Sequence, residues 1–248
     1  MIRVVDLFKS FGEKCVLRGL NLEIQKGETL VIIGQSGSGK SVLLKHLIGL
    51  IKPDRGQIYV DGVEVTELGE EALFEVRKKF AMLFQGAALF DSMTVAKNVS
   101  FGLERYTDYP PPKIRKIVSE CLEKVGLRKV EHLMPFELSG GMKKRVGLAR
   151  AIAYHPEIIL YDEPSTGIDQ IRANAINALI NRMKMDLNVT SVVITHDMDT
   201  TYKVADRIAM LYQGQIIAVG EPEEIKRSTN LVVQQFIRGL AEGPLENW

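Results

Sequence analysis

Two glycines five residues apart, followed at once by lysine and serine, most constrain what this chain folds into. The segment runs from Gly34 to Ser41 and reads GQSGSGKS. An apolar, β-branched run (29–33) precedes it, and apolar residues at helical spacing follow it. In this strand–loop–helix context, the glycines let backbone N–H groups converge on one anion, and the helix N-terminus adds partial positive charge. A plain glycine-rich turn with a surface lysine leaves these flanks unexplained, so the segment predicts a nucleotide-binding site.

The loop sets the first group of expected site residues. Lys40 is expected to reach the β- and γ-phosphates of ATP, and the Ser41 hydroxyl to bind Mg²⁺. The predicted ATP-binding residues of this segment are Gly34, Gln35, Ser36, Gly37, Ser38, Gly39, Lys40, Ser41 and Val42.

Composition restricts the class of protein. The chain is 46% hydrophobic and 25% charged, which is typical of a soluble globular protein, and its net charge of +1 gives no argument for nucleic acid as a partner. Cys15 and Cys121 are far apart and match no metal-binding spacing. The N-terminus lacks the apolar core of a signal peptide, and no window approaches 18 uninterrupted apolar residues. We therefore expect a cytoplasmic protein that does not cross a membrane by itself.

The order of elements predicts the fold class. Residues 2–24 alternate like antiparallel strands, short buried strands recur further along, and 208–219 reads as a hairpin. From about 90 to 155 the periodicity is helical, with three prolines at 110–112 expected to form a rigid loop before a helix. Strands alternating with helices favour a mainly parallel sheet. We predict one α/β domain over 1–240, with an N-terminal antiparallel β-subdomain, an inserted α-helical subdomain (about 90–155) and a tail at 241–248.

Two carboxylates follow the apolar run at 158–161. P-loop NTPases hold the Mg²⁺-coordinating aspartate at the end of such a strand, which assigns that role to Asp162. Glu163 is then placed to orient or deprotonate the attacking water. The alternative is a pair of solvated carboxylates at a strand end.

The start of a second predicted helix, at residues 139–141, has the features of an anion-binding site. Ser139 is a predicted N-cap, and Gly140 and Gly141 open a basic helix. Together with the glycine-rich loop, this start suggests a site shared between two copies of the chain. From physics alone, an ordinary capped helix is the simpler interpretation.

In this order, the motifs resemble those of the ATPase subunit of an ABC transporter over nearly the whole chain. They are the phosphate loop, Gln85, the 138–141 segment LSGG, Asp162-Glu163, the 165–169 segment STGID and His196. The resemblance implies that Gln85 touches Mg²⁺ and that His196 contacts the γ-phosphate. It also implies that Ser139, Gly140 and Gly141 face the γ-phosphate held by the other copy, and that Asp169 communicates across the dimer.

Other positions follow from the same resemblance. Phe11 stands where an aromatic ring is expected to stack on adenine; the alternative is a core residue of a hairpin. Met142 stands where many family members have glutamine, and Gly167, Ile168 and Gln170 differ from the commonest dimer loop. None of these departures removes a catalytic group, so the resemblance implies a hydrolysing ATPase.

A finer resemblance covers three segments, at 85–90, 138–142 and 235–245. They are similar to ATPases of the MCE-associated (Mla and Mkl type) lipid transporters. This implies transport of phospholipid or related lipids, a second and identical ATPase subunit, a membrane permease, an MCE-domain protein and a STAS-domain subunit. It also implies a peripheral position on the inner (plasma) membrane through the permease. Alternatives are an importer of small solutes such as amino acids, a soluble non-transport ABC ATPase, and a nucleotide-gated module without turnover.

Overall fold

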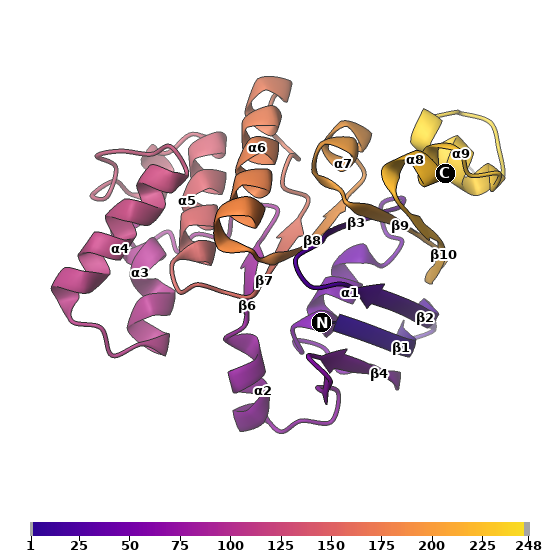
Figure 1. Cartoon of the computed structure of the whole chain (residues 1–248), viewed down its shortest axis with the longest axis horizontal. Coiled ribbons are helices and arrows are strands. Elements are labelled where there is room, and N and C mark those ends of the chain that lie inside the picture. The colour runs from indigo at the N-terminus through magenta and orange to yellow at the C-terminus, as the bar shows by residue number, and fades with distance from the viewer. Residues whose placement is uncertain (1, 246–248) are drawn as a thin grey trace. The chain divides into compact units, whose positions relative to one another are not determined.

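The computed structural model describes residues 2–245, and the last three residues of the predicted tail, 246–248, lie outside the described part (Figure 1). The chain divides into two compact units. The first combines residues 1–77 with 190–248, and the second is residues 78–189.

An antiparallel sheet forms the N-terminal part of the first unit. Strand β1 (Ile2–Phe11) pairs with β2 (Lys14–Ile24) on one side and β4 (Arg55–Val60) on the other, and β5 (Val63–Glu64) follows β4. Alternate side chains are buried at Ile2 and Val4 of β1 and at Leu20, Leu22 and Ile24 of β2, as the sequence predicted; a register shift between Val4 and Leu7 interrupts the alternation in β1. This sheet is the expected β-subdomain.

A second sheet carries the central strand of the first unit. Strand β3 (Thr29–Ile33) lies parallel to both β8 (Thr190–Thr195) and β9 (Arg207–Tyr212), and β10 (Gln215–Gly220) turns back along β9. Every residue of β3 and β8 is buried, which explains why apolar and β-branched residues dominate their sequences.

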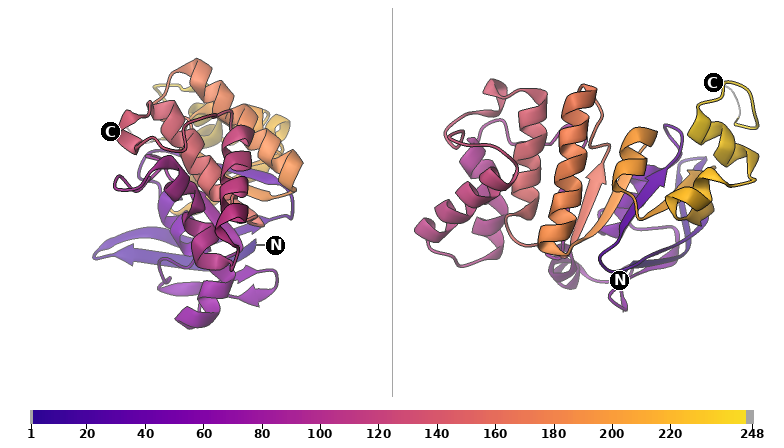
Figure 2. Two further views of the ribbon diagram at one scale, coloured as in Figure 1. Left: turned by 90° about the vertical axis from the view of Figure 1, so that its left-hand side faces the viewer. Right: turned by 45° about the horizontal axis from the view of Figure 1, so that its top comes forward.

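Five helices lie in the described part of the first unit. They are α1 (Lys40–Leu47), α2 (Glu70–Arg77), α7 (Met198–Val204), α8 (Pro222–Lys226) and α9 (Leu231–Arg238). Helix α1 starts directly at the end of the glycine-rich loop. Helices α8 and α9 continue the chain after β10, in the yellow part of Figures 1 and 2.

The second unit is mainly helical. Its described strands, β6 (Phe80–Leu83) and β7 (Ile158–Asp162), are parallel. Its helices are α3 (Val95–Tyr106), α4 (Pro111–Lys124), the short 3-10 helix η1 (Pro135–Glu137), α5 (Gly140–Ile152) and α6 (Gln170–Leu187). Helices α3, α4 and α5 pack on one another and lie close together in Figure 1. Each of them buries apolar side chains, among them Val99, Leu122 and Leu148. They are the helices expected between about 90 and 155.

The proline run begins a helix, so its prediction as a loop was wrong. Helix α4 starts at Pro111, and Pro111 and Pro112 lie in its first turn. Proline is tolerated there because first-turn N–H groups have no partner inside the helix, and its fixed φ already suits the helix. Helices α2, α7 and α8, of 8, 7 and 5 residues, were not predicted. Each buries a single apolar side chain (Leu73, Val204 and Ile225), so no repeated apolar face marks them in the sequence.

Candidate active site

The backbone of the phosphate loop requires glycine at several positions. Gly34, Gly37 and Gly39 have φ angles of +155°, +78° and +105°, which L-residues with side chains rarely adopt. A Cβ atom on Gly34 would lie 2.3 Å from the carbonyl oxygen of Leu211. The loop can therefore curl tightly against the neighbouring strand only without side chains at these points.

The side chains of the loop fit a phosphate group. Lys40 is 7% exposed, and its Nζ donates to the carbonyl oxygens of Gly34 at 2.7 Å and Gln35 at 3.0 Å. The Lys40 ammonium group therefore lies against the backbone at the start of the loop. The Ser38 Oγ is buried without a hydrogen-bond partner among the described residues. An orphaned buried hydroxyl costs about 1–3 kcal/mol, and a phosphate oxygen would satisfy it.

His196 and the phosphate loop share one cavity. Parallel strands β3 and β8 pair Ile33 with Thr195, so the loop and His196 leave the sheet at the same edge. A cavity of about 940 Å³ is lined by loop residues 35–38, by exposed His196, by Tyr212 and Gln213, and by residues of α9 and beyond. The structure thus brings together the two motifs of the first unit that were expected at the phosphates.

The C-terminal segment forms one wall of this cavity. Gln235 is 5% exposed; its Oε1 accepts from the Leu245 backbone N–H at 2.7 Å, and its Nε2 donates to the Leu240 carbonyl at 3.3 Å. Leu245 is itself buried. Residues 240–245 therefore fold back on α9 and line the cavity.

Phe11 is not a core residue of the hairpin. It ends β1 with 49% of its surface exposed, and the Lys9 ammonium lies 5.6 Å from the ring centre. The hairpin-core alternative is therefore wrong. An exposed aromatic face is what stacking on a nucleotide base requires, and that role stays a prediction.

In the second unit, Gln85 and the acidic pair Asp162-Glu163 lie where two neighbouring strands end, at the same edge of the sheet. Parallel strands β6 and β7 pair Leu83 with Tyr161, so Gln85 and Asp162-Glu163 follow the same ends of neighbouring strands. Glu163 has φ +49°, which is unusual for a residue with a side chain. The Thr166 hydroxyl donates to Glu163 Oε2 at 3.1 Å, which fixes the direction of the carboxylate.

The starts of α5 and α6 lie next to each other. Ser139 caps α5 by accepting from the Met142 N–H at 3.3 Å, while Gly140 is exposed and Gly141 is buried. Asp169 caps α6 by accepting from the Arg172 N–H at 2.9 Å. A Cβ on Gly141 would lie 3.3 Å from Arg172 Cδ, so the Arg172 side chain of α6 lies against the first turn of α5.

Three polar residues that belong to no motif of the sequence support the site: Asn98, Arg150 and Lys144. They occupy buried or half-buried positions in helices α3 and α5, where the helical pattern expects apolar residues. Such polar residues within an apolar face are the signal that could have identified them.

Arg150 and Asn98 hold the segment that follows Gln85. Arg150 donates to the carbonyl oxygens of Ala87 and Ala88 at 2.7 Å each, and both alanines have positive φ angles. Burial lowers the pKa of Arg150. The Asn98 side chain accepts from the Phe90 N–H at 2.8 Å and donates to the carbonyls of Phe90 at 3.2 Å and Met93 at 3.0 Å.

Removing the Asn98 side chain is expected to destabilise this unit. Asn98 is fully buried, so Asn98→Ala leaves backbone groups of residues 90 and 93 without partners. We expect the free energy of unfolding to fall by about 2–3 kcal/mol, because orphaned buried groups keep their desolvation cost. Denaturant unfolding measures it. Ser119→Ala, at an exposed position of α4, is the control, with an expected change within about 0.5 kcal/mol; equal stabilities of the two variants would contradict the role of Asn98.

The described residues contain neither a ready-made metal cluster nor a membrane-spanning helix. Among residues 2–245, no group of three or more His, Cys, Asp or Glu side chains could hold a metal ion. Magnesium in phosphoryl-transfer sites is held by one or two carboxylates besides phosphates and water, so such a cluster is not required. Ser41, Gln85 and Asp162 stay its predicted ligands. In the same described range, no helix has the length and apolar character to span a membrane.

Comparison with known proteins agrees with this geometry. A family model described as "ABC transporter" matches residues 17–166. The chain is 42% identical over 245 residues to the intermembrane phospholipid transport system ATP-binding protein MlaF of Haemophilus influenzae, covering 99% of this chain and 93% of that protein. It is 41% identical to the probable ribonucleotide transport ATP-binding protein mkl of Mycobacterium leprae, covering 98% of this chain and 70% of that protein.

A solved structure has the same fold. It is the dimeric post-hydrolysis state of the ATP-binding cassette MJ0796 bound to ADP and Pi, with TM-score 0.82 and 31% identity, covering 89% of this chain and 98% of that one. The glycine loop on β3, the antiparallel β-subdomain and the helical subdomain define a P-loop ATPase cassette. The chain belongs to the ABC transporter family, as one of its ATP-hydrolysing subunits.

Proposed function

We propose that this chain binds and hydrolyses ATP to energise lipid transport, with phospholipid as the transported class, through a separate membrane permease. The observation that carries the proposal is the 42% identity over 99% of the chain to a phospholipid transport ATP-binding protein. The relative named for ribonucleotide transport matches almost as well, so a small-solute importer, for amino acids or nucleotides, is the second candidate.

The proposed chemistry is positioning plus electrostatic stabilisation of the γ-phosphoryl group. Lys40 and the loop N–H groups bind the phosphates, and Phe11 stacks on adenine. Glu163 takes a proton from the attacking water, while His196 contacts the γ-phosphate. Bound Mg²⁺ would neutralise phosphate charge; its proposed ligands are Ser41, Gln85 and Asp162.

A second copy of the chain would complete each site. The sequence holds one phosphate loop and one Ser139-Gly140-Gly141 segment, and the similar cassette MJ0796 was solved as a dimer. In the proposed homodimer, Ser139, Gly140 and Gly141 of one copy face the ATP on Lys40 of the other. Asp169, at the start of α6, lies in the loop that communicates across the dimer.

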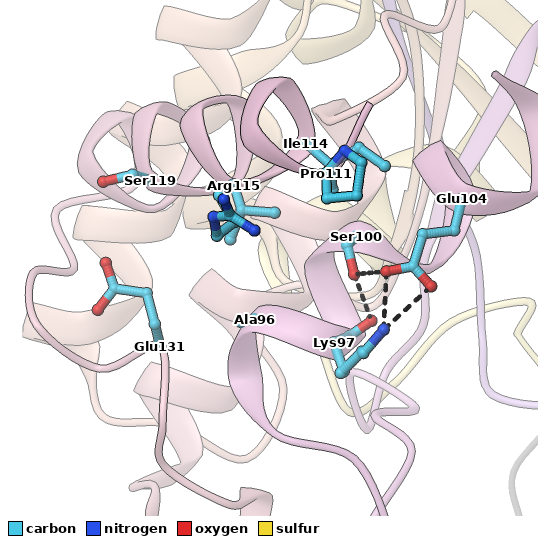
Figure 3. Close-up of a pocket in the computed structure, with 10 residues that line it drawn as sticks. Ala96, Lys97, Ser100, Glu104, Pro111, Ile114, Arg115, Ser119 and Glu131 are labelled. Atoms are coloured by element: carbon cyan, nitrogen blue, oxygen red, sulfur yellow. Dashed lines mark hydrogen bonds and ion pairs between the residues drawn. The ribbon is translucent and has the colours of Figure 1, made fainter. Parts of the chain in front are cut away.

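A pocket in the helical subdomain offers a contact for the permease (Figure 3). It has a volume of about 570 Å³, and apolar side chains of α3 and α4, including Ala96, Ile114 and Val118, line it. Four charged residues also line it: Lys97 and Glu104 form an ion pair, whereas Arg115 and Glu131 have none within residues 2–245. These features suit a permease helix with an apolar side chain between an acidic and a basic residue.

Placing a carboxylate in this pocket should separate transporter assembly from ATP binding. Ile114→Glu is expected to reduce recovery of the ATPase with its permease at least about tenfold, because a desolvated carboxylate opposes an apolar contact. Affinity purification from membranes measures this, with nucleotide binding recorded in parallel. Met185→Glu, at an 81% exposed position of α6, is the matched control. Equal recovery of the two variants would remove the pocket from the interface.

The same purification from membranes tests the function when proteins and lipids are identified by mass spectrometry. Lipid transport predicts a permease, an MCE-domain protein, a STAS-domain subunit and co-purified phospholipid, with the ATPase peripheral on the cytoplasmic side of the inner (plasma) membrane. A solute-binding protein in their place would support the small-solute importer. Recovery without any membrane protein would favour a non-transport ATPase.

A further inference from the structure

Lys144 is a buried, positively charged residue to which no sequence motif gives a role. It lies in α5, five residues after Ser139, and only 5% of its surface is exposed. Its Nζ donates to the carbonyl oxygen of Pro164 at 2.8 Å and to that of Glu163 at 3.3 Å. Burial lowers the pKa of Lys144, and the nearby Glu163 carboxylate opposes that shift. A buried ammonium is costly unless hydrogen-bonded, so its position requires these carbonyls.

The two carbonyls belong to the part of the backbone that sets the direction of Glu163. Glu163 has φ +49°, a left-handed conformation that the surrounding structure must hold in place for a residue with a Cβ. The Thr166 N–H donates to the Glu163 carbonyl at 3.2 Å, and the Thr166 hydroxyl donates to the carboxylate. Lys144 therefore fixes the backbone on one side while Thr166 fixes both backbone and carboxylate on the other.

We propose that Lys144 is a positioning residue for ATP hydrolysis: its ammonium group holds the 163–164 backbone so that the Glu163 carboxylate meets the attacking water. The inference rests on the proposed role of Glu163 as general base. A base must lie within hydrogen-bond reach of its proton, and a displacement of about 1 Å can cost about 10²-fold in rate. Loss of the ammonium should therefore slow the chemical step and leave ATP binding unchanged.

The test compares three variants of the full chain in steady-state ATP hydrolysis. Lys144→Met keeps an unbranched side chain but removes the donor, and we expect kcat to fall about 10- to 100-fold with KM for ATP unchanged. Lys144→Arg keeps a cation that donates to both carbonyls and should restore most of kcat. Lys143→Met removes the same charge one residue earlier, where no hydrogen bond to these carbonyls exists, and should match wild type.

Combination with Glu163→Gln separates positioning from general destabilisation. If Lys144 acts through Glu163, then Lys144→Met should change residual turnover less than twofold in the Glu163→Gln background. Equal losses in both backgrounds, or wild-type kcat in Lys144→Met alone, would overturn the inference. Wild-type turnover of Glu163→Gln alone would instead overturn the proposed function of Glu163.

A second variant covers the possibility that Lys144→Met does not fold, as judged by thermal unfolding. Lys144→Gln keeps an amide donor but has a shorter reach and no charge. We expect its kcat to fall about threefold to tenfold, again with KM unchanged. Wild-type kcat in Lys144→Gln would overturn the need for the ammonium group.

Discussion

Replacing Glu163 with glutamine is expected to lower ATP turnover by about 10²–10⁴-fold, the contribution of a general base. Glutamine keeps the size of the carboxylate but cannot take a proton from water. ATP and Mg²⁺ should still bind, because Lys40, Ser41 and Asp162 are unchanged. Phosphate release measures the rate.

The same variant should accumulate as a closed dimer. In the proposed homodimer, two ATP molecules bridge Lys40 of one copy and Ser139 of the other, and hydrolysis removes the bridge by releasing the γ-phosphate. Glu163→Gln is therefore expected to elute as a dimer with ATP and Mg²⁺ and as a monomer with ADP. The assay is best run on the isolated subunit and on the complex with its permease.

A matched control makes the result specific to this carboxylate. Glu120→Gln changes an exposed glutamate of α4, whose carboxylate lies 3.9 Å from Lys116 Nζ, and it should keep wild-type turnover and elution. Wild-type turnover in Glu163→Gln would show that Glu163 is not the base, and the proposed mechanism would then be wrong.

Lys40→Ala is expected to abolish turnover and strongly weaken ATP binding. The β- and γ-phosphates lose their cation, and the loop loses the donor to the carbonyls of Gly34 and Gln35. Both effects act on the phosphate site, so affinity and rate fall together. Binding of a fluorescent ATP analogue and phosphate release are the measurements.

The control for this substitution lies on the same helix. Lys45 is an exposed lysine of α1, and Lys45→Ala removes the same side chain away from the loop. It should bind and hydrolyse ATP like the wild type. Wild-type affinity and hydrolysis in Lys40→Ala would contradict the phosphate-loop assignment.

Much of the fold was predictable because its signals are local. The phosphate loop needs glycine at Gly34 and Gly39, because both have positive φ angles that residues with a side chain rarely adopt. Strands β3 and β8 are rich in apolar and β-branched residues because both of their faces are buried, and such a run is visible in the sequence itself. Alternation predicted β1 and β2 for the same reason.

Only the tertiary structure decided how distant residues support the site. Gln235 holds residues 240–245 against α9, and Lys144 reaches across 20 residues of sequence to Pro164. Neither contact follows from spacing, since each depends on where two separate elements come together. Exposure of Phe11 is also decided by packing, because an aromatic residue at a strand end suits either the core or the surface. Local pattern specifies elements and loops, whereas burial and long-range hydrogen bonds exist only once those elements pack.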